Sequence, residues 1–263
     1  MRKIYLFTFM MLLLVHLKGQ AQQITLHVER AGTLHGMINA SRLPYITDLK
    51  LTGELNGTDI SFIRTLVKKN LRFLDLSEAR IVEGGAIYYS NYRTSNDIIG
   101  SYMFYNPDYS PISPCAISKI NLPNSVTGIE EGAFKSCTSL TDINIPNSVT
   151  SIGEQAFYNC DNLKSVYMNA STPPFIGSQA FHNISKDLTI YIPRGSYTAY
   201  WLSYWGNYNL VEYDPTDIQG VTTSAHNGVE KYFSIDGRPL PGPCKGVNII
   251  QDTDGKTRKA WIP

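Results

Sequence analysis

The chain has 263 residues, of which 43% are hydrophobic and 17% charged, and its formal net charge at pH 7 is +1. Because it has no surplus of basic residues, we expect no nucleic-acid partner. A chain of this length ordinarily folds as one or two globular domains. A repeated period in the sequence overrides that expectation, because repeat arrays do not follow the size rules of globular domains.

The N-terminal segment has the pattern of a secretory signal peptide. Arg2 and Lys3 precede an apolar run over residues 4–17, and Gly19-Gln20-Ala21 is a small-residue cleavage site. The run is shorter than the roughly 20 apolar residues that a membrane-spanning helix needs. We therefore expect cleavage after Ala21 and no transmembrane segment afterwards. The mature protein is expected to be secreted, periplasmic or exposed on the outer cell surface, and not a lipoprotein, because no Cys directly follows the run.

One phrase of the sequence occurs twice at a fixed spacing. INLPNSVTGIEEGAFKSCTSL over 120–140 recurs as INIPNSVTSIGEQAFYNCDNL over 143–163, and Phe134, Phe157 and Phe181 are separated by 23 and then 24 residues. This period is typical of solenoids, in which each repeat forms one coil that must stack on its neighbours to bury its apolar side chains. We expect about six coils, with strands near Leu49, Leu74, Ile120, Ile143, Val166 and Ile190.

The predicted fold class is an α/β repeat solenoid, a leucine-rich repeat of parallel strands with short helices or turns. Ile120 and Leu122 alternate with a polar residue, as one face of a strand requires. Ile129, Ala133 and Cys137 have the i, i+4, i+8 spacing of a helix face. The side chains expected in the core are Leu49, Leu51, Leu74, Leu76, Phe104, Ile120, Leu122, Ile129, Ala133, Phe134, Cys137, Ile143, Ile145, Ile152, Ala156, Phe157, Cys160, Ala180 and Phe181.

These repeats resemble those of the BspA-like leucine-rich-repeat family of bacterial surface and secreted proteins, whose pattern is I-x-I-P-x-S-V-x-x-I-x-x-x-A-F-x-x-C-x-x-L. The resemblance is close over 120–163 and general over about 46–213. It implies a solenoid outside the cell that takes part in adhesion or host-protein binding rather than catalysis. The next coil departs from the pattern, because Ser171-Thr172-Pro173-Pro174 replaces the Pro-Asn-Ser turn and Asn183 is placed where Cys falls.

The ends of the repeat array and the tail differ from the repeats in composition. Two turn signals, Asp236-Gly237 and Asp254-Gly255, lie between alternating apolar residues and predict that the tail is a small β-hairpin module. The tail is similar to type IX sorting domains of exported bacterial proteins, and both a sorting role and an inert module remain open. The expected domains are a signal peptide (1–21), an N-terminal cap (22–45), the solenoid (46–213, with an insertion at 82–113 and an aromatic C-terminal cap at 195–213), a linker (214–230) and the β-hairpin module (231–263).

Two clusters of aromatic residues are candidates for binding. The insertion is rich in Tyr, Ser, Asn and Gly, the composition of binding loops, although it could also be a bulge packed on the solenoid. Its candidate ligand contacts are Tyr88, Tyr89, Tyr92 and Tyr109. The C-terminal cap is expected to cover the open end of the stack, with a sugar-binding platform as the alternative. Its aromatic residues are Tyr197, Tyr200, Trp201, Trp205 and Tyr208.

Residues with catalytic or metal-binding chemistry are scattered. Cys115, Cys137 and Cys160 lie 22 and 23 residues apart at matching repeat positions. They predict a buried ladder of free thiols, with a Cys137–Cys160 disulfide as the alternative. Zinc would need closely spaced ligand pairs, so we expect no metal and no cofactor. The remaining candidates, His27, His35, His182, His226 and Glu130-Glu131, have no nucleophile motif beside them.

The sequence therefore predicts a binding protein rather than an enzyme. Repeat stacks present long continuous surfaces, which suit a host or matrix protein or a glycan. One alternative is a structural envelope component that associates with other copies of itself. A more remote alternative is a polysaccharide-processing enzyme of the β-helix type, which would need acidic or basic side chains stacked on one face.

Overall fold

The computed structural model describes residues 22–105 and 115–214, and the backbone of four strands between residues 231 and 262. The chain divides into two compact units, Met1–Tyr213 and Asp214–Pro263, and each is considered by itself. The predicted signal peptide lies outside the described residues. Within the described part of the chain, no helix has the length and apolar character needed to cross a membrane.

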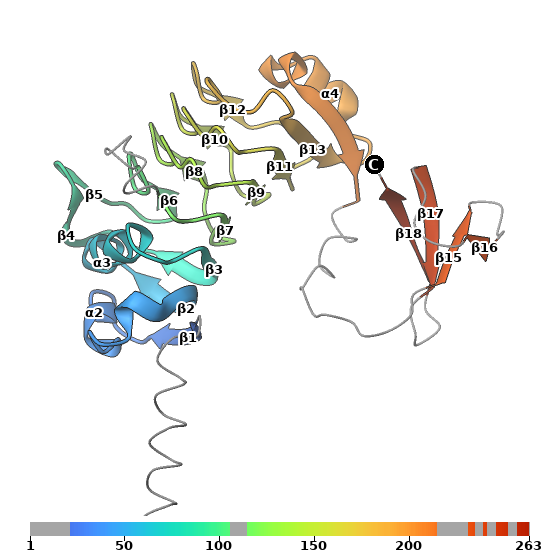
Figure 1. Cartoon of the computed structure of the whole chain (residues 1–263). Coiled ribbons are helices and arrows are strands. Elements are labelled where there is room, and N and C mark those ends of the chain that lie inside the picture. Colours follow the sequence, from blue (N-terminus) through green and yellow to red (C-terminus); the bar gives the residue numbers. More distant parts are fainter. Residues whose placement is uncertain are drawn as a thin grey trace, which may run out of the picture. The chain divides into compact units, whose positions relative to one another are not determined.

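An eight-stranded parallel sheet forms one side of the first unit (Figure 1). Ile120 pairs with Ile143 and Val166 with Ile190, each one period apart, and Ile120 pairs on its other side with Leu74, two periods earlier in the chain. This confirms the predicted stack of parallel strands. In order across the sheet, the strands are β1 (Gln22–Val28), β2 (Ile46–Leu55), β3 (Phe73–Ile81), β7 (Lys119–Asn121), β9 (Asp142–Ile145), β11 (Ser165–Met168), β13 (Thr189–Pro193) and β14 (Asn209–Tyr213).

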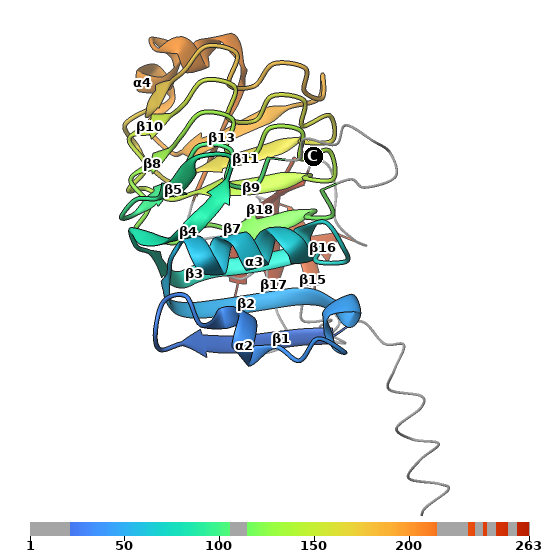
Figure 2. The same ribbon diagram turned by 90° about the vertical axis from the view of Figure 1, so that its left-hand side faces the viewer.

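The opposite side of the stack carries a second, shorter parallel sheet (Figure 2). Each middle coil therefore contributes one strand to each sheet, joined by turns. The apolar side chains lie in the space between the two sheets. In order, the strands of the second sheet are β12 (Phe175–Ile176), β10 (Ser151–Ile152), β8 (Gly128–Ile129) and β6 (Ile98–Ile99).

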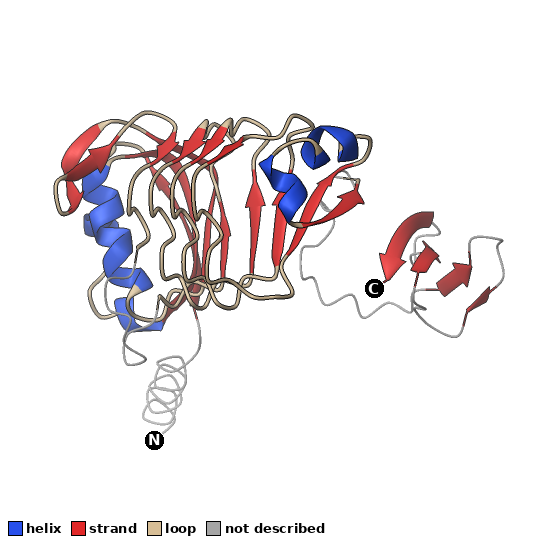
Figure 3. Ribbon diagram, turned by 90° about the horizontal axis from the view of Figure 1, so that it is seen from above, coloured by secondary structure: helices blue, strands red, loops and turns tan. Residues whose placement is uncertain are grey.

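Among the described residues, helices lie at the two ends of the stack and not in its middle (Figure 3). The helix expected over Ile129, Ala133 and Cys137 is wrong, because Ile129 ends strand β8 and residues 131–136 form turns. Their peptide groups bond between coils, with Phe134 N donating to Ala156 O at 2.8 Å. The helical elements are α2 (Leu34–Met37), α3 (Gly57–Val67), α4 (Tyr197–Trp201) and the 3-10 helices η2 (Leu43–Tyr45) and η3 (Tyr204–Asn207).

The turn that replaces the helix uses left-handed backbone conformations. Ser136, Asn159 and Asn183 have φ angles of 59°, 59° and 50°. Asn183 also donates from Nδ2 to Asn159 Oδ1 at 3.0 Å. Asn183 therefore aligns with Asn159 and not with Cys160, which corrects its predicted place. Ile184 occupies the position of the cysteine and packs against the core.

A column of stacked aromatic rings runs through the core. The rings of Phe104, Phe134, Phe157 and Phe181 lie 5.3, 5.1 and 4.9 Å apart between successive centroids, and the planes of each pair differ by 13° or less. The column ends against Trp205, whose ring centroid lies 5.7 Å from that of Phe181. All side chains expected in the core from the sequence are buried.

The region expected as one insertion over 82–113 is divided. A hairpin of β4 (Gly84–Tyr89) and β5 (Tyr92–Thr94) projects first. The chain then returns to the stack, where Ile98 pairs with Gly128 and the ring of Phe104 joins the aromatic column. Residues 98–104 are therefore part of a coil, and the last part of the expected insertion, residues 106–113, lies outside the described residues.

The longest of the described helices, α3, ties the N-terminal strand to the stack. Asn56 caps α3 by accepting from Thr58 N at 3.0 Å, and the buried Asp59 accepts from Asn56 N at 3.0 Å. The same carboxylate accepts from Gly32 N at 2.5 Å and Leu34 N at 3.0 Å. One buried side chain therefore joins α3 to the loop that follows β1.

The second unit contains a four-stranded antiparallel sheet. β17 and β18 pair along six residue pairs, from Gly246↔Ile262 to Gln251↔Thr257, and β15 pairs with the other side of β17. In order, the strands are β16 (Pro239–Leu240), β15 (Lys231–Ser234), β17 (Gly246–Gln251) and β18 (Thr257–Ile262).

Candidate functional site

One row of side chains crosses the outer face of the eight-stranded sheet. Asn121, Asn144, Tyr167 and Tyr191 are successive partners in register on β7, β9, β11 and β13. Because side chains alternate along a strand, these four point away from the core that holds their neighbours Ile120, Ile143, Val166 and Ile190. We call these four residues the Asn-Tyr row.

The two tyrosines of the row are held against each other. The rings of Tyr167 and Tyr191 are stacked, with centroids 4.6 Å apart and planes 13° apart. Tyr213 packs edge-on against Tyr167, with its hydroxyl donating to Asn169 Oδ1 at 2.6 Å. Partial burial, with the neighbouring Tyr191, raises the pKa of Tyr167, so its hydroxyl is neutral at physiological pH.

The two asparagines of the row are available to a ligand. Neither Asn121 nor Asn144 forms a side-chain hydrogen bond with another described residue, and Asn144 is exposed. Each amide offers two N–H donors and a carbonyl acceptor. The row therefore combines unused hydrogen-bonding groups with half-buried aromatic rings and carries no charge.

Charged side chains flank the row towards the N-terminal end of the sheet. Lys50 forms an ion pair with Glu78 at 2.5 Å, and the Lys119 ammonium lies 5.8 Å from the centroid of the Phe73 ring. The side chain of Lys50 is 34% exposed and that of Glu78 61% exposed. Exposed pairs of this kind contribute little to stability. Lys119 on β7 and Asp142 on β9 lie on the same face, two residues before Asn121 and Asn144, so the neutral part of the face is the Asn-Tyr row itself.

Tyr88 is not available as a ligand contact. It was predicted as one, but its side chain is 5% exposed and its hydroxyl donates to Ser101 O at 2.8 Å. Burial raises the pKa of Tyr88. The preceding residue, Ile87, is 42% exposed, so Tyr88 points to the opposite side of β4, towards the stack. Tyr109 lies outside the described residues.

Tyr89 and Tyr92 belong to an aromatic cluster with Tyr102 and Tyr105. The ring centroids of this cluster lie 5.4 to 6.1 Å apart, and both predicted contacts pack partly against the core. The guanidinium of Arg64 lies 4.7 Å from the centroid of the Tyr89 ring, a cation–π contact. The structure therefore brings these two tyrosines together, and their rings pack the β4–β5 hairpin against the stack. Both side chains remain partly exposed.

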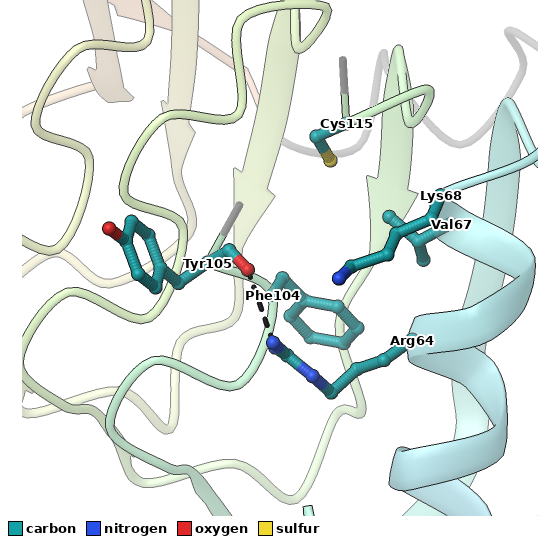
Figure 4. A pocket seen from close by; sticks show the side chains of 6 residues that line it. All are labelled: Arg64, Val67, Lys68, Phe104, Tyr105 and Cys115. Atoms are coloured by element: carbon teal, nitrogen blue, oxygen red, sulfur yellow. Dashed lines mark hydrogen bonds between the residues drawn. The ribbon is translucent and has the colours of Figure 1, made fainter. Parts of the chain in front are cut away.

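Arg64 fastens the turn that follows β6 (Figure 4). It extends from α3 and donates to Tyr102 O at 2.9 Å, Met103 O at 2.7 Å and Tyr105 O at 3.3 Å. Burial lowers the pKa of its guanidinium. The cavity beside it, which also reaches Cys115, has a volume of about 10 Å³, enough for about one water molecule. This arrangement holds the turn and leaves no room for a larger ligand.

The three described cysteines are buried free thiols. Cys137 Sγ donates to Phe104 O at 3.3 Å, and Cys160 Sγ donates to Phe134 O at 3.2 Å, so each thiol bonds to the preceding coil. Burial raises the pKa of Cys160, which opposes thiolate formation. Cys115 is one position out of register with Cys137. It lies five residues before Ile120, whereas Cys137 lies six residues before Ile143, the strand partner of Ile120. The expected matching of all three positions is therefore corrected.

Two of the histidines, His27 and His182, and the acidic residue Glu130 have structural partners, and His226 lies outside the described residues. His27 Nδ1 is 2.8 Å from Thr52 Oγ1, and the ring of His182 stacks on Tyr158 at 5.4 Å. Glu130 accepts from Ser101 N at 2.9 Å. Within residues 22–105 and 115–214, no three His, Cys, Asp or Glu residues lie close enough to hold a metal ion.

The C-terminal aromatic residues have two different environments. Tyr200 and Trp205 are fully buried, and their polar atoms donate to Ala170 O at 2.7 Å and Pro174 O at 2.8 Å. Both acceptors belong to the turn that departs from the repeat pattern. That departure is the feature of the sequence that could have indicated where Tyr200 and Trp205 bind. Tyr197 and Trp201 are instead exposed and stacked, with ring centroids 6.0 Å apart.

Comparison with known proteins identifies the repeats. Residues 97–216 match, in six copies, the family model described as the BspA type leucine rich repeat region. The repeats of this segment are therefore similar to those of the BspA type. A search of curated proteins found no match. Among solved structures, a leucine-rich repeat protein from Bacteroides ovatus ATCC 8483 is similar at 20% sequence identity and a TM-score of 0.36, over 72% of this chain and 42% of that one. The chain thus spans less than half the length of that protein.

The BspA-type match agrees with the described coils. It starts one residue before β6, so it includes residues 98–104, which return to the stack after the β4–β5 hairpin. The whole Asn-Tyr row lies within the segment that matches the family model. Each of its residues directly follows the first apolar residue of its strand, as Asn121 follows Ile120. The family pattern leaves this position open (x), which is why the row did not stand out in the sequence.

Proposed function

We propose that the protein is an exported, non-enzymatic recognition protein that binds a protein or a glycan of a host surface or matrix through the Asn-Tyr row. The observation that carries this proposal is the unpaired state of the Asn121 and Asn144 amides beside the stacked rings of Tyr167 and Tyr191. Export is supported by the basic and apolar pattern of the N-terminal residues.

The geometry of the row suits an extended polymer. Its side chains are repeated at the strand spacing of about 4.8 Å, so one ligand chain lying across the strands would meet equivalent groups in succession. Tyrosine provides contact area with little loss of conformational entropy. The amides would supply directional hydrogen bonds.

The test is a binding screen with two matched variants. The purified protein is screened against extracellular matrix proteins and a glycan array, and the strongest hit is titrated. Asn144→Lys places a long charged side chain in the middle of the row, whereas Ser151→Lys places the same side chain in the same coil on the other sheet, where Ser151 is also exposed.

The proposal predicts that Asn144→Lys weakens binding at least about tenfold, which corresponds to about 1.4 kcal/mol. Ser151→Lys should leave the affinity unchanged. Equal losses in the two variants would contradict the row as the binding surface. Turnover of a polysaccharide by the purified protein would contradict the non-enzymatic part of the proposal.

Self-association is a second candidate, favoured by the exposed apolar end of the stack. Trp201, Leu202 and Tyr204 are 56%, 80% and 74% exposed. Contiguous exposed apolar side chains frequently mark protein interfaces. Sedimentation velocity would show a concentration-dependent dimer that Leu202→Glu abolishes if this end is an interface, and a monomer at all concentrations if it is not.

A further inference from the structure

A hollow of about 380 Å³ lies between the turns of two successive coils, on the connection from the eight-stranded to the four-stranded sheet. One wall is the turn between β9 and β10, and the other is the turn between β11 and β12. None of the residues that line it is charged. It includes no residue of the Asn-Tyr row.

The hollow exists because a ladder of hydrogen bonds stops there. One coil earlier, Ser148 Oγ donates to Asn124 O at 2.9 Å and to Val126 O at 2.6 Å, which seats one turn directly on the previous one. Ser171 occupies the corresponding place in the next coil but forms no hydrogen bond with a described residue. The turn after Met168 is one residue longer than the turn after Ile145, so its chain takes another path.

The interruption leaves acceptors without donors. Asn147 and Val149, the equivalents of Asn124 and Val126, both line the hollow, and their carbonyl oxygens accept no hydrogen bond from any described residue. Pro174, on the facing wall, has no N–H to offer them. Polar backbone groups normally find a partner, so these carbonyls are open to a donor from a ligand or from water.

The facing wall is held rigidly from behind. Tyr200 donates to Ala170 O at 2.7 Å, Trp205 Nε1 to Pro174 O at 2.8 Å, and the Tyr213 hydroxyl to Asn169 Oδ1 at 2.6 Å. Tyr200 and Trp205 are themselves fully buried. The wall is therefore formed before any ligand arrives, which lowers the ordering cost of binding.

We propose that this hollow is a binding site for a neutral saccharide, separate from the Asn-Tyr row. Sugar hydroxyls can donate to the free carbonyls of Asn147 and Val149. Other sugar hydroxyls can bond with the Thr172 hydroxyl or donate to the Thr150 hydroxyl, whose own proton is donated to Thr127 O at 3.1 Å. The apolar C–H face of a sugar ring matches the proline surface opposite. The uncharged lining gives no partner to a carboxylate, sulfate or phosphate, so acidic sugars are disfavoured.

The site can be tested with a reporter that belongs to its wall. The protein is titrated with a panel of uncharged hexose oligosaccharides and with uronate and sulfated oligosaccharides, and the indole N–H resonances are followed by NMR. A neutral oligosaccharide should shift the Trp205 resonance at millimolar or lower concentration and leave that of the exposed Trp201 unchanged. A Trp205 resonance unmoved by every neutral oligosaccharide, or a preference for the acidic ones, would overturn the proposal.

Two blocking variants and a matched control complete the test. Asn147→Trp and Thr172→Trp each place a large side chain in the hollow, whereas Asn124→Trp makes the same change one coil earlier, outside it; all three positions are exposed, so folding should be kept and is checked by thermal unfolding. Each blocking variant should weaken saccharide binding at least about tenfold and the control less than about twofold. Equal effects of Asn147→Trp and Asn124→Trp would also overturn the site. Asn144→Lys should leave this binding intact, so the failure of either proposal can be told from that of the other.

Discussion

The rings of Phe134 and Phe157 lie face to face, with centroids 5.1 Å apart and planes 5° apart. They come from the same position of successive coils, and Phe104 and Phe181 extend the same column in both directions. Each ring thus covers the open face of its neighbour. This contact shows in one pair how a coil that cannot bury its own apolar residues is stabilised by stacking.

Removing a ring from the middle of the column should be costly. Phe157→Ala deletes a fully buried side chain between two others, and large-to-small changes of this kind cost about 3 to 5 kcal/mol. The measurement is the free energy of unfolding in urea. Phe175→Ala, at a position 68% exposed, is the control and should change that free energy by less than about 0.5 kcal/mol. Similar losses in both variants would contradict the column as the centre of the core.

The C-terminal cap should depend on one indole hydrogen bond. Trp205→Phe keeps an aromatic ring but removes the donor to Pro174 O, leaving a buried carbonyl unsatisfied at a cost of about 1 to 3 kcal/mol. Trp201→Phe makes the same change at a position 56% exposed and should be nearly neutral. Thermal unfolding of both variants checks this, and a smaller effect at Trp205 than at Trp201 would show that the cap is not seated on this turn.

At the other end, Asp59 should control the N-terminal strand. Its carboxylate accepts from Gly32 N, Leu34 N and Asn56 N, so Asp59→Ala removes three hydrogen bonds at a buried site. With each bond to a charged group contributing about 1.5 to 3 kcal/mol, we expect local unfolding of β1 and its loop. Limited proteolysis should then cut within 22–45 before the rest of the stack. Asp48→Ala, on the partly exposed outer face of β2, should not change the pattern of cleavage.

The arrangement of strands could be predicted from the sequence, because the spacing of Leu74, Ile120, Ile143 and Val166 reflects directly which residues pair. The conformation of the turns could not be predicted in this way. The i, i+4, i+8 spacing of buried residues such as Ala133 is shared by a helix and by a turn whose peptide groups bond to the next coil, and only the neighbouring coil decides between them.

The candidate site was less predictable than the fold. Tyr88 and Tyr89 look alike in a sequence rich in tyrosine, yet strand alternation buries the first and leaves the second partly exposed. Asn121 and Asn144 resemble ordinary solvent-facing residues of a strand. They become candidates only when the register places Asn144 beside Tyr167 and Asn121 beside Asn144, and when neither amide has a side-chain hydrogen bond to another described residue.

Stability at high pH should depend on Tyr213. Burial, with the nearby Tyr167, raises the pKa of Tyr213 to about 12, above its ordinary value of about 10. Between these values the unfolded chain releases a proton that the folded protein retains, so the free energy of unfolding falls as pH rises from about 10 to 12. Tyr213→Phe should make this decline shallower and leave the pH dependence below 9 unchanged. An unchanged slope would contradict the burial of this hydroxyl.

The most direct test of recognition through the Asn-Tyr row is hydrogen–deuterium exchange of the unaltered protein with and without the strongest ligand from the binding screen. The account predicts added protection in peptides that contain β7, β9, β11 and β13, the strands that carry Asn121, Asn144, Tyr167 and Tyr191. Protection confined to the four-stranded sheet, or to the β4–β5 hairpin, would contradict it.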